Sequence, residues 1–439
     1  MRPLLVLISI CAVLFTGRIL KIYAEDNNEY EFQFDESEIE KKPISIGGYV
    51  ELFPTLYITD EKSALYRLKY YDENPCNPYA AAYLRAQPDL ILEKGIIKAF
   101  VRGYGTAGYE NNGWHHDAIL YEGYGTLKPY QNLAIDAGKK TQKWGKGYAW
   151  NPVAFVDRPK NTDDPELANE GYVIASADVI FSFNGPLKAL AVTPVALPVY
   201  DTINDDFGKR EDWNFAGKLY LLFLDTDIDF MFLAGESKGD RYGVDISRNL
   251  TSSFEIHGEY AYIPDFTKRT LDESGAVHEE EFNAHASLAG IRYLTERETT
   301  YIIEYYYNGT GMSKSEMRNY YAFIDRAYSA YLESGSEELF KRATAMAEGN
   351  YGKMSPMRNY LYLRISQKEP FDILYFTPAI SSIINIDDSS FTITPELLYA
   401  GINNLELRLR YTWLQGKENS EYGEKMADHR CDLRLRYSF

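Results

Sequence analysis

The stretch that decides the fold is Cys431-Asp432-Leu433-Arg434-Leu435-Arg436-Tyr437-Ser438-Phe439, in which apolar and polar residues alternate without interruption. In a β-strand this period of two places the apolar side chains on one face and the charged side chains on the other. Residues 405–413 repeat the pattern, and their arginines again fall on the polar face. Both stretches are therefore expected to be strands that separate an apolar environment from water.

Arginines that recur on one strand face restrict the possible architectures. A sandwich of two packed sheets would have to bury them, which is costly for charged groups without partners. A membrane barrel has lipid outside and water inside, so its polar strand faces are solvated. The alternation therefore predicts a transmembrane antiparallel β-barrel.

The same alternation of apolar and polar residues predicts about eighteen strands between residues 43 and 439, with about sixteen as the alternative count. The connections between them alternate between short turns and longer loops, as expected for periplasmic turns and external loops. Residues 107–115, 141–171 and 264–282 are among the expected external loops. Pro54 interrupts the first strand and predicts a local loss of pairing, because proline has no N–H to donate.

Composition agrees with a membrane barrel. The chain has 38 tyrosines against 5 tryptophans, and barrels place aromatic residues at both membrane interfaces. Its net charge of −18 argues against nucleic-acid binding, which requires a basic surface. The acidic loops are expected to be solvated, or to share divalent cations with lipopolysaccharide beside the surrounding outer-membrane lipid.

The amino-terminal part has a different character. Residues 1–24 read as a secretory signal peptide, with Arg2 before an apolar run that is too short to span a bilayer. Residues 25–42 are acidic and are expected to form a periplasmic leader before the barrel, residues 43–439. Only Cys76 and Cys431 remain after the signal peptide, without haem or zinc spacing, so no cofactor or metal is expected.

Residues 309–357 depart from the strand period. Residues 316–332 and 337–347 have apolar residues at helical spacing. Two interpretations stay open for this segment: a plug or constriction folded into the pore, or an extracellular lid packed on the barrel rim.

Alternation also assigns charged residues to the lumen. The basic ones come from strands that barrel closure makes nearly neighbours, namely Arg85, Lys98, Arg102, Arg358, Arg364, Arg408, Arg410, Arg434 and Arg436. Most of the acidic ones lie on the strands between, with two beside the arginines: Glu51, Glu122, Asp136, Asp178, Asp229, Asp245, Glu255, Glu259, Glu304 and Glu406. The lumen would then have a basic wall and an acidic wall, and walls of fixed charge select ions. Alternatively, the two walls neutralise each other and make the barrel rigid.

Two motifs carry resemblances to known families. The strand that ends in Tyr437 and Phe439 resembles the carboxyl-terminal assembly signal of bacterial outer-membrane barrels, which implies recognition by the barrel-assembly machinery. Residues 138–148, GKKTQKWGKGY, followed by Asn151-Pro152, are similar to a pattern in porin-like barrels related to the alginate-export family. That resemblance implies a channel for carbohydrate acids or other small solutes. Alternatively, Trp144, Gly145, Asn151 and Pro152 only shape a tight loop at the membrane interface.

The function expected from the sequence is passive or weakly selective diffusion of small polar solutes, anions among them, through a bacterial outer-membrane channel. No enzyme is expected, because the six histidines occur in no recognisable catalytic motif. The alternative is a non-catalytic scaffold barrel that sheaths a periplasmic partner such as a multihaem cytochrome. The sequence leaves the oligomeric state open.

Overall fold

The computed structural model describes residues 43–72, 77–110 and 113–439. The expected signal peptide, the expected leader and Cys76 lie outside these residues.

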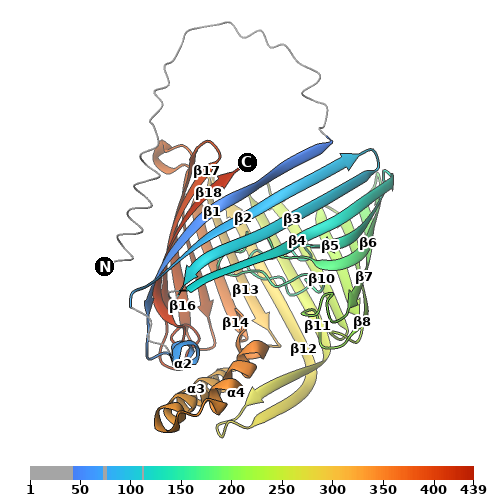
Figure 1. Cartoon of the computed structure of the whole chain (residues 1–439). Helices are drawn as coiled ribbons and strands as arrows, with labels where there is room; N and C mark the ends of the chain where they lie inside the picture. Colours follow the sequence, from blue (N-terminus) through green and yellow to red (C-terminus); the bar gives the residue numbers. More distant parts are fainter. Residues whose placement is uncertain (1–42, 73–76, 111–112) are drawn as a thin grey trace, which may run out of the picture. The chain divides into compact units, whose positions relative to one another are not determined.

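Within this part of the chain, eighteen antiparallel strands close into a barrel (Figure 1). Each strand pairs with its neighbours in sequence, and β1 pairs with both β2 and β18, so the sheet has no free edge. Closure matters because an unpaired strand edge in lipid would leave backbone groups without hydrogen bonds. The predicted fold class and strand number are confirmed.

The strands have the following bounds: β1 (Ile44–Thr59), β2 (Tyr79–Lys94), β3 (Ile97–Glu110), β4 (Gly113–Tyr130), β5 (Leu133–Lys140), β6 (Tyr172–Ser182), β7 (Leu187–Val199), β8 (Asp212–Phe223), β9 (Thr226–Ala234), β10 (Arg241–Thr251), β11 (Phe254–Leu271), β12 (Val277–Leu294), β13 (Thr299–Asn308), β14 (Asn359–Gln367), β15 (Phe376–Asn385), β16 (Ser390–Ile402), β17 (Leu405–Gln415) and β18 (Ala427–Ser438).

The two faces of the strands differ as the alternation predicts. On β10, Ile246 is 46% exposed on the outer surface, whereas Asp245 beside it is 1% exposed inside the barrel. Pro54 breaks the pairing on one side only, since the register between β1 and β18 passes from Leu52 directly to Thr55. On its other side Pro54 stays paired with Ala82 of β2.

Two expected loops are hairpins instead. Residues 107–115 belong largely to β3 and β4, and residues 264–282 extend β11 and β12 beyond the barrel rim (Figure 1). Cross-strand side-chain pairs support the second extension: the rings of Phe266 and Phe282 lie 5.8 Å apart, and Arg269 pairs with Glu279 at 2.5 Å. Such pairs stabilise a hairpin beyond the membrane, where lipid no longer imposes alternation.

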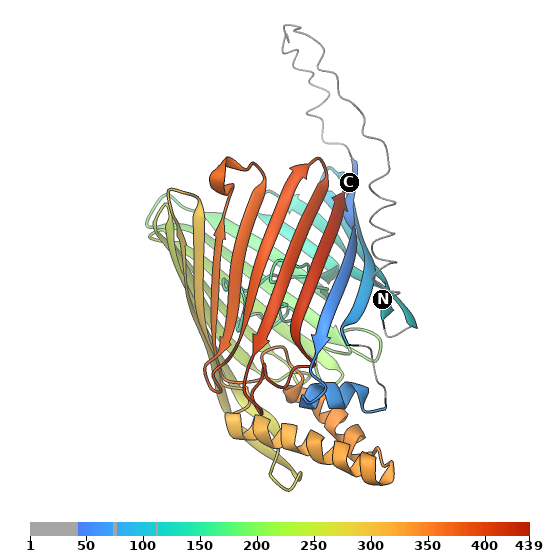
Figure 2. The same ribbon diagram turned by 90° about the vertical axis from the view of Figure 1, so that its left-hand side faces the viewer.

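The helices gather at the barrel end opposite the carboxyl terminus (Figures 1 and 2). They are α2 (Ala64–Tyr70), α3 (Lys314–Ser334) and α4 (Glu338–Met346), followed by a short π-helical turn, η2 (Ala347–Tyr351); a 3-10 turn, η3 (Pro370–Asp372), lies between β14 and β15. Ser313 and Glu316 form a reciprocal cap at the start of α3, and Gly335 ends it with φ 70°. None of the helices in the described part of the chain is long and apolar enough to span a bilayer.

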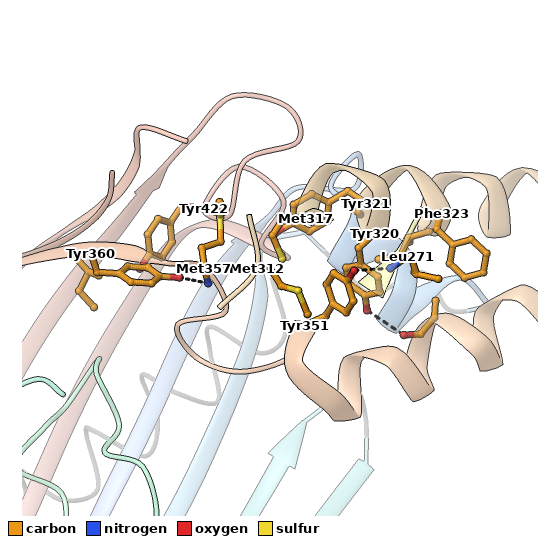
Figure 3. Close-up of a cluster of buried hydrophobic side chains, with 14 of the residues drawn as sticks. Leu271, Met312, Met317, Tyr320, Tyr321, Phe323, Tyr351, Met357, Tyr360 and Tyr422 are labelled. Carbon is orange, nitrogen blue, oxygen red and sulfur yellow. Dashed lines mark hydrogen bonds between the residues drawn. The ribbon is translucent and has the colours of Figure 1, made fainter. Parts of the chain in front are cut away.

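A cluster of buried side chains joins these helices to the barrel rim (Figure 3). Tyr351 stacks on Tyr320 with ring centroids 4.4 Å apart, and its hydroxyl accepts a hydrogen bond from the Leu271 backbone N–H at 2.9 Å. Farther along the rim, the Tyr360 hydroxyl accepts from the Met357 N–H at 2.7 Å. This packing gives the helical segment the position of a lid on the rim rather than that of a plug.

Candidate functional site

The segment that enters the lumen is residues 141–171, between β5 and β6. It runs as blue-green coil between the strand walls in Figures 1 and 2. The sequence predicted an external loop here, and the connection does begin and end at the same barrel end as the other long loops, but its residues fold into the lumen. The segment folds inward because its backbone and side chains satisfy charged groups on two opposite walls of the barrel.

On the acidic wall, two carboxylates hold the backbone of the segment. Glu259 of β11 accepts hydrogen bonds from the Lys146 and Gly147 N–H groups, each at 2.6 Å. Glu304 of β13 accepts from the Ala149 N–H at 2.8 Å and also contacts His257 Nε2 at 2.8 Å. Each carboxylate accepts hydrogen bonds from more than one donor, so these contacts fix the backbone of the segment.

The neighbouring strands add a charged contact. Asp245 of β10 is directly opposite both Asp229 of β9 and Glu259 of β11 in the strand register. Like charges in this arrangement repel. The Lys146 ammonium relieves the repulsion, because its Nζ lies 2.9 Å from Asp229 and 3.9 Å from Asp245.

On the basic wall, the segment supplies carboxylates. Asp164 binds Arg408 of β17 through both oxygens, and its Oδ2 lies 3.3 Å from Nη1 of Arg434 of β18. The adjacent Asp163 pairs with Arg430 at 3.1 Å, and its carbonyl accepts from Arg410 at 2.8 Å. The segment therefore spans the lumen from one wall to the other.

The motif Trp144, Gly145, Asn151 and Pro152 builds the turn that meets Glu259. Gly145 has φ 93°, and a Cβ at this position would lie 2.5 Å from Asn151 Nδ2. Asn151 Nδ2 donates to the Gly147 carbonyl at 3.1 Å and to Glu259 at 3.0 Å. Trp144 is buried, and Pro152 lines the cavity described below. The motif thus shapes a turn inside the barrel rather than one at the membrane interface.

The predicted basic residues face inward, and most have acidic partners. Arg408, Arg410 and Arg434 are each only 6% exposed, because the inward segment covers them. The other pairs are Arg436 with Glu51 at 2.8 Å, Arg85 with Glu51 at 3.1 Å, Arg102 with Asp89 at 2.7 Å and Arg364 with Glu396 at 3.2 Å. Lys98 is half-buried opposite Thr126, and Arg358 Nε donates to the Gly311 carbonyl at 3.4 Å just before β14.

The remaining predicted acids also have partners inside the barrel. Glu122 accepts from the Thr141 hydroxyl at 2.7 Å, Asp136 from Lys140 at 2.5 Å, Asp178 from the Thr193 hydroxyl at 2.5 Å, Glu255 from Ser247 at 3.4 Å and Glu406 from Arg434 at 3.4 Å. Asp163, Asp164, Glu396 and Arg430 complete these networks and were missed from the sequence. The mutual neutralisation of the walls is therefore extensive, and the inward segment supplies much of it.

A cavity of about 1020 Å³ lies beside the inward segment. The charged residues in its lining are mostly basic: Arg102, Lys143, Arg158, Lys160, Lys238, Arg241 and Lys353, against Glu122, Asp157, Glu166 and Asp206. Its size is that of a site for a small organic molecule, and aromatic side chains such as Phe155 and Phe207 line part of it. Among the described residues, no group of three His, Cys, Asp or Glu side chains is arranged to hold a metal ion.

The arrangement of strands resembles that of solved outer-membrane porins. OccAB1 of Acinetobacter baumannii aligns with a TM-score of 0.54 and 11% identity, over 90% of this chain and 96% of that chain. OccK5 (OpdH) of Pseudomonas aeruginosa aligns with a TM-score of 0.50 and 10% identity, over 90% of this chain and 98% of that chain. No family model matches the sequence, and the comparison with curated proteins finds no match. At these identities the likeness concerns the fold, which agrees with the expected location in a bacterial outer membrane.

Proposed function

We propose that this chain is a non-catalytic outer-membrane channel through which small polar solutes diffuse, and that residues 141–171 form its constriction. The observation that carries the proposal is the attachment of this segment to both walls, through Glu259 on one side and Arg408 on the other. A segment held in this way narrows the lumen to a defined path. Tight solute-sized paths lined by fixed charge are the basis of selective permeation.

Anionic solutes are the favoured class. Charges on the two walls largely neutralise each other, so the cavity lining contributes the main imbalance, with seven basic residues against four acidic ones. Carbohydrate acids, the solutes implied by the resemblance of residues 138–148, belong to this class. The inward segment also argues against the scaffold alternative, because a folded partner threaded through the barrel would have to displace it.

We also propose that the carboxyl-terminal strand carries the signal for barrel assembly. Tyr437 and Phe439 are about half exposed at the end of β18, and the Phe439 N–H donates to the Gly48 carbonyl at 3.0 Å. Their position beside β1, at the seam that closes the barrel, supports a role as the signal read by the assembly machinery. Contact of the external loops with lipopolysaccharide is proposed on their acidic charge alone.

Planar bilayer recordings test the channel. Purified full-length chain, shown to be folded by heat-modifiable migration in gels, is expected to give discrete channels whose reversal potential in a potassium chloride gradient indicates a modest preference for chloride. Folded protein that inserts into the bilayer without conducting would refute the channel. Protein that conducts with a preference for potassium would support the channel function but refute the preference for anions.

A further inference from the structure

Three basic residues in the cavity lack acidic partners. Arg241 is the first residue of β10, Lys238 precedes it in the connection from β9, and Lys353 follows η2 in the connection from β13 to β14. All three line the same cavity. Within the described residues, neither Arg241 nor Lys353 makes a side-chain hydrogen bond or ion pair, and the buried Arg241 Nε has no partner. A buried guanidinium nitrogen without a partner is costly unless something else binds the group.

Lys238 is held in place but keeps its charge unpaired. Its Nζ donates to the Phe155 carbonyl at 3.2 Å and lies 4.4 Å from the centre of the Phe207 ring. A carbonyl and an aromatic ring orient an ammonium without neutralising it. The ammonium is therefore fixed at the cavity wall and available to an anion.

The nearest carboxylates are already engaged. Asp157 accepts hydrogen bonds from the backbone N–H groups of Gln142 at 2.7 Å and Trp144 at 3.0 Å. Asp206 binds Arg158 through both oxygens, at 2.9 and 3.0 Å. Arg158 also lies 3.6 Å from Glu170, so its charge is compensated, and the local excess of positive charge comes from Lys238, Arg241 and Lys353.

The ionisation of the two lysines reflects this crowding. Desolvation in the cavity, together with the neighbouring Arg241 charge, lowers the pKa of Lys353 to about 8. Burial also lowers the pKa of Lys238 well below its usual range, with additional repulsion from Arg241 and Lys353. An anion bound among them would offset both effects, because a nearby opposite charge favours the charged form of a lysine.

We propose that Lys238, Arg241 and Lys353 form a binding site for a multivalent oxyanion, such as a phosphate or sulfate group, in the cavity beside the inward segment. The planar guanidinium of Arg241 suits two oxygens of such a group, and the two ammonium groups act as point charges. A cluster of three unpaired basic side chains favours a dianion over chloride. The inference deepens the proposed channel function, since the anion would occupy the solute's path.

Titration calorimetry of the detergent-solubilised full chain with inorganic phosphate tests the site, with sodium chloride of matched ionic strength as the reference titration. Wild-type protein is expected to bind phosphate with proton uptake above pH 7, as the lysines regain their protons. Arg241→Gln is expected to weaken binding on the order of tenfold or more, and Arg241→Lys less. Arg248→Gln, an exposed residue at the other end of the same strand, is the matched control and is expected to bind like the wild type.

Phosphate binding that is equal in the wild type and in Arg241→Gln, or no heat beyond the chloride reference, would overturn the site. Adding a short phosphate monoester in a parallel titration distinguishes a free solute from a lipid headgroup. Binding of the soluble ester supports the solute, whereas binding only to phospholipid-containing micelles overturns a site on the solute path. Conductance in potassium chloride is recorded separately. Protein that conducts chloride but does not bind phosphate would overturn this site alone, whereas protein that does not conduct would overturn the channel.

Discussion

Asp164 Oδ1 accepts a hydrogen bond from Arg408 Nη1 at 3.1 Å, although the two residues are 244 positions apart in the chain. Asp164 belongs to the inward segment and Arg408 to β17, so this contact fixes the segment to the barrel wall. Arg434 and Arg410 approach the same carboxylate at 3.3 and 3.9 Å. Three buried guanidinium groups therefore share the Asp164 carboxylate, and each also has a second acidic partner: Glu396 for Arg408, Asp432 for Arg410 and Glu406 for Arg434.

Replacing Asp164 with Asn is expected to release the carboxyl-terminal half of the inward segment. Removing one partner of a buried ion pair costs at most about 3–5 kcal/mol, and here the three arginines would keep only their other partners, Glu396, Asp432 and Glu406. The barrel itself, held by strand pairing, should stay folded. Larger and noisier unitary conductance in planar bilayers is the expected readout.

Glu236→Gln is the control for this experiment. It removes the ion pair with Arg210, in which both side chains are about 70% exposed, so little effect is expected. Unchanged conductance of Asp164→Asn, with folding verified, would show that the contact does not hold the constriction.

The same contact changes the expectation for the lumenal arginines. From the sequence, replacing Arg408, Arg410, Arg434 and Arg436 with Gln should leave folding intact and shift selectivity toward cations. In the structure the first three lie beneath the inward segment and bind Asp164. Replacing these arginines would leave the buried Asp164 carboxylate without its partners. Any shift in ion selectivity would therefore accompany release of the segment.

The strands could be predicted from the sequence because lipid and water impose a local period of two on every strand. The helices α3 and α4 could be predicted for a similar reason, since their apolar residues follow the helical period. The path of residues 141–171 could not be predicted in this way. Its partners, such as Glu259, lie more than a hundred positions away, and no periodicity records such contacts.

A signal for the inward segment was nevertheless present in the strand register. Glu259 faces Asp245 and Leu288 on its neighbouring strands, and Glu304 faces Gly290 and Tyr362. Neither acid has a lysine or arginine directly opposite it in this register. Once the register is known, buried acids without cross-strand cations predict that a loop must supply donors.

Gly145→Ala tests the turn that supplies those donors. The φ of 93° is strained for alanine, and the added Cβ would also lie 2.9 Å from Glu259 Oε1. A cost of about 1–3 kcal/mol is expected for the backbone strain, concentrated on the inward segment. Amide hydrogen exchange of residues 144–153 should rise. Gly185→Ala, in a turn where an added Cβ meets nothing within 4 Å, should leave exchange unchanged. Equal exchange in the two variants would contradict the role of Gly145.

Phe340→Ala tests whether the helical segment is a lid independent of the pore. The Phe340 ring stacks on Tyr71 with centroids 4.2 Å apart and is 1% exposed. Truncating a buried aromatic residue costs about 3–5 kcal/mol, enough to loosen the packing of α3 and α4. Faster proteolysis within residues 314–351 is expected, with unchanged heat-modifiable migration and unitary conductance. Leu332→Ala, on the exposed surface of α3, should change neither property. Altered conductance in Phe340→Ala alone would place the helices in the solute path.

Burial of Glu421 at the barrel rim predicts that the stability of the folded protein depends on pH. Its Oε2 accepts from the Tyr360 hydroxyl at 2.7 Å and from Asn385 Nδ2 at 2.6 Å, in the loop between β17 and β18. Complete burial, together with the nearby Asp388 charge, raises the pKa of this carboxyl from its ordinary value of 4.5 to about 7. The folded state therefore keeps a proton that the unfolded state loses above pH 4.5.

The sign of the effect follows from this difference in proton binding. Stability contributed by protonated Glu421 is fully present below pH 4.5 and is lost as the pH rises to about 7. The total loss is about 3 kcal/mol. The glutamine in Glu421→Gln cannot ionise, so the variant is expected to lose this pH dependence of the free energy of unfolding and to be more stable than the wild type at pH 8.

Denaturant unfolding in detergent at pH 4.5 and pH 8, together with hydrogen exchange of residues 416–426, measures the difference. The exposed Glu418→Gln in the same loop should retain the wild-type slope, and a Glu421→Gln variant that also retained it would show that Glu421 is ionised throughout this pH range.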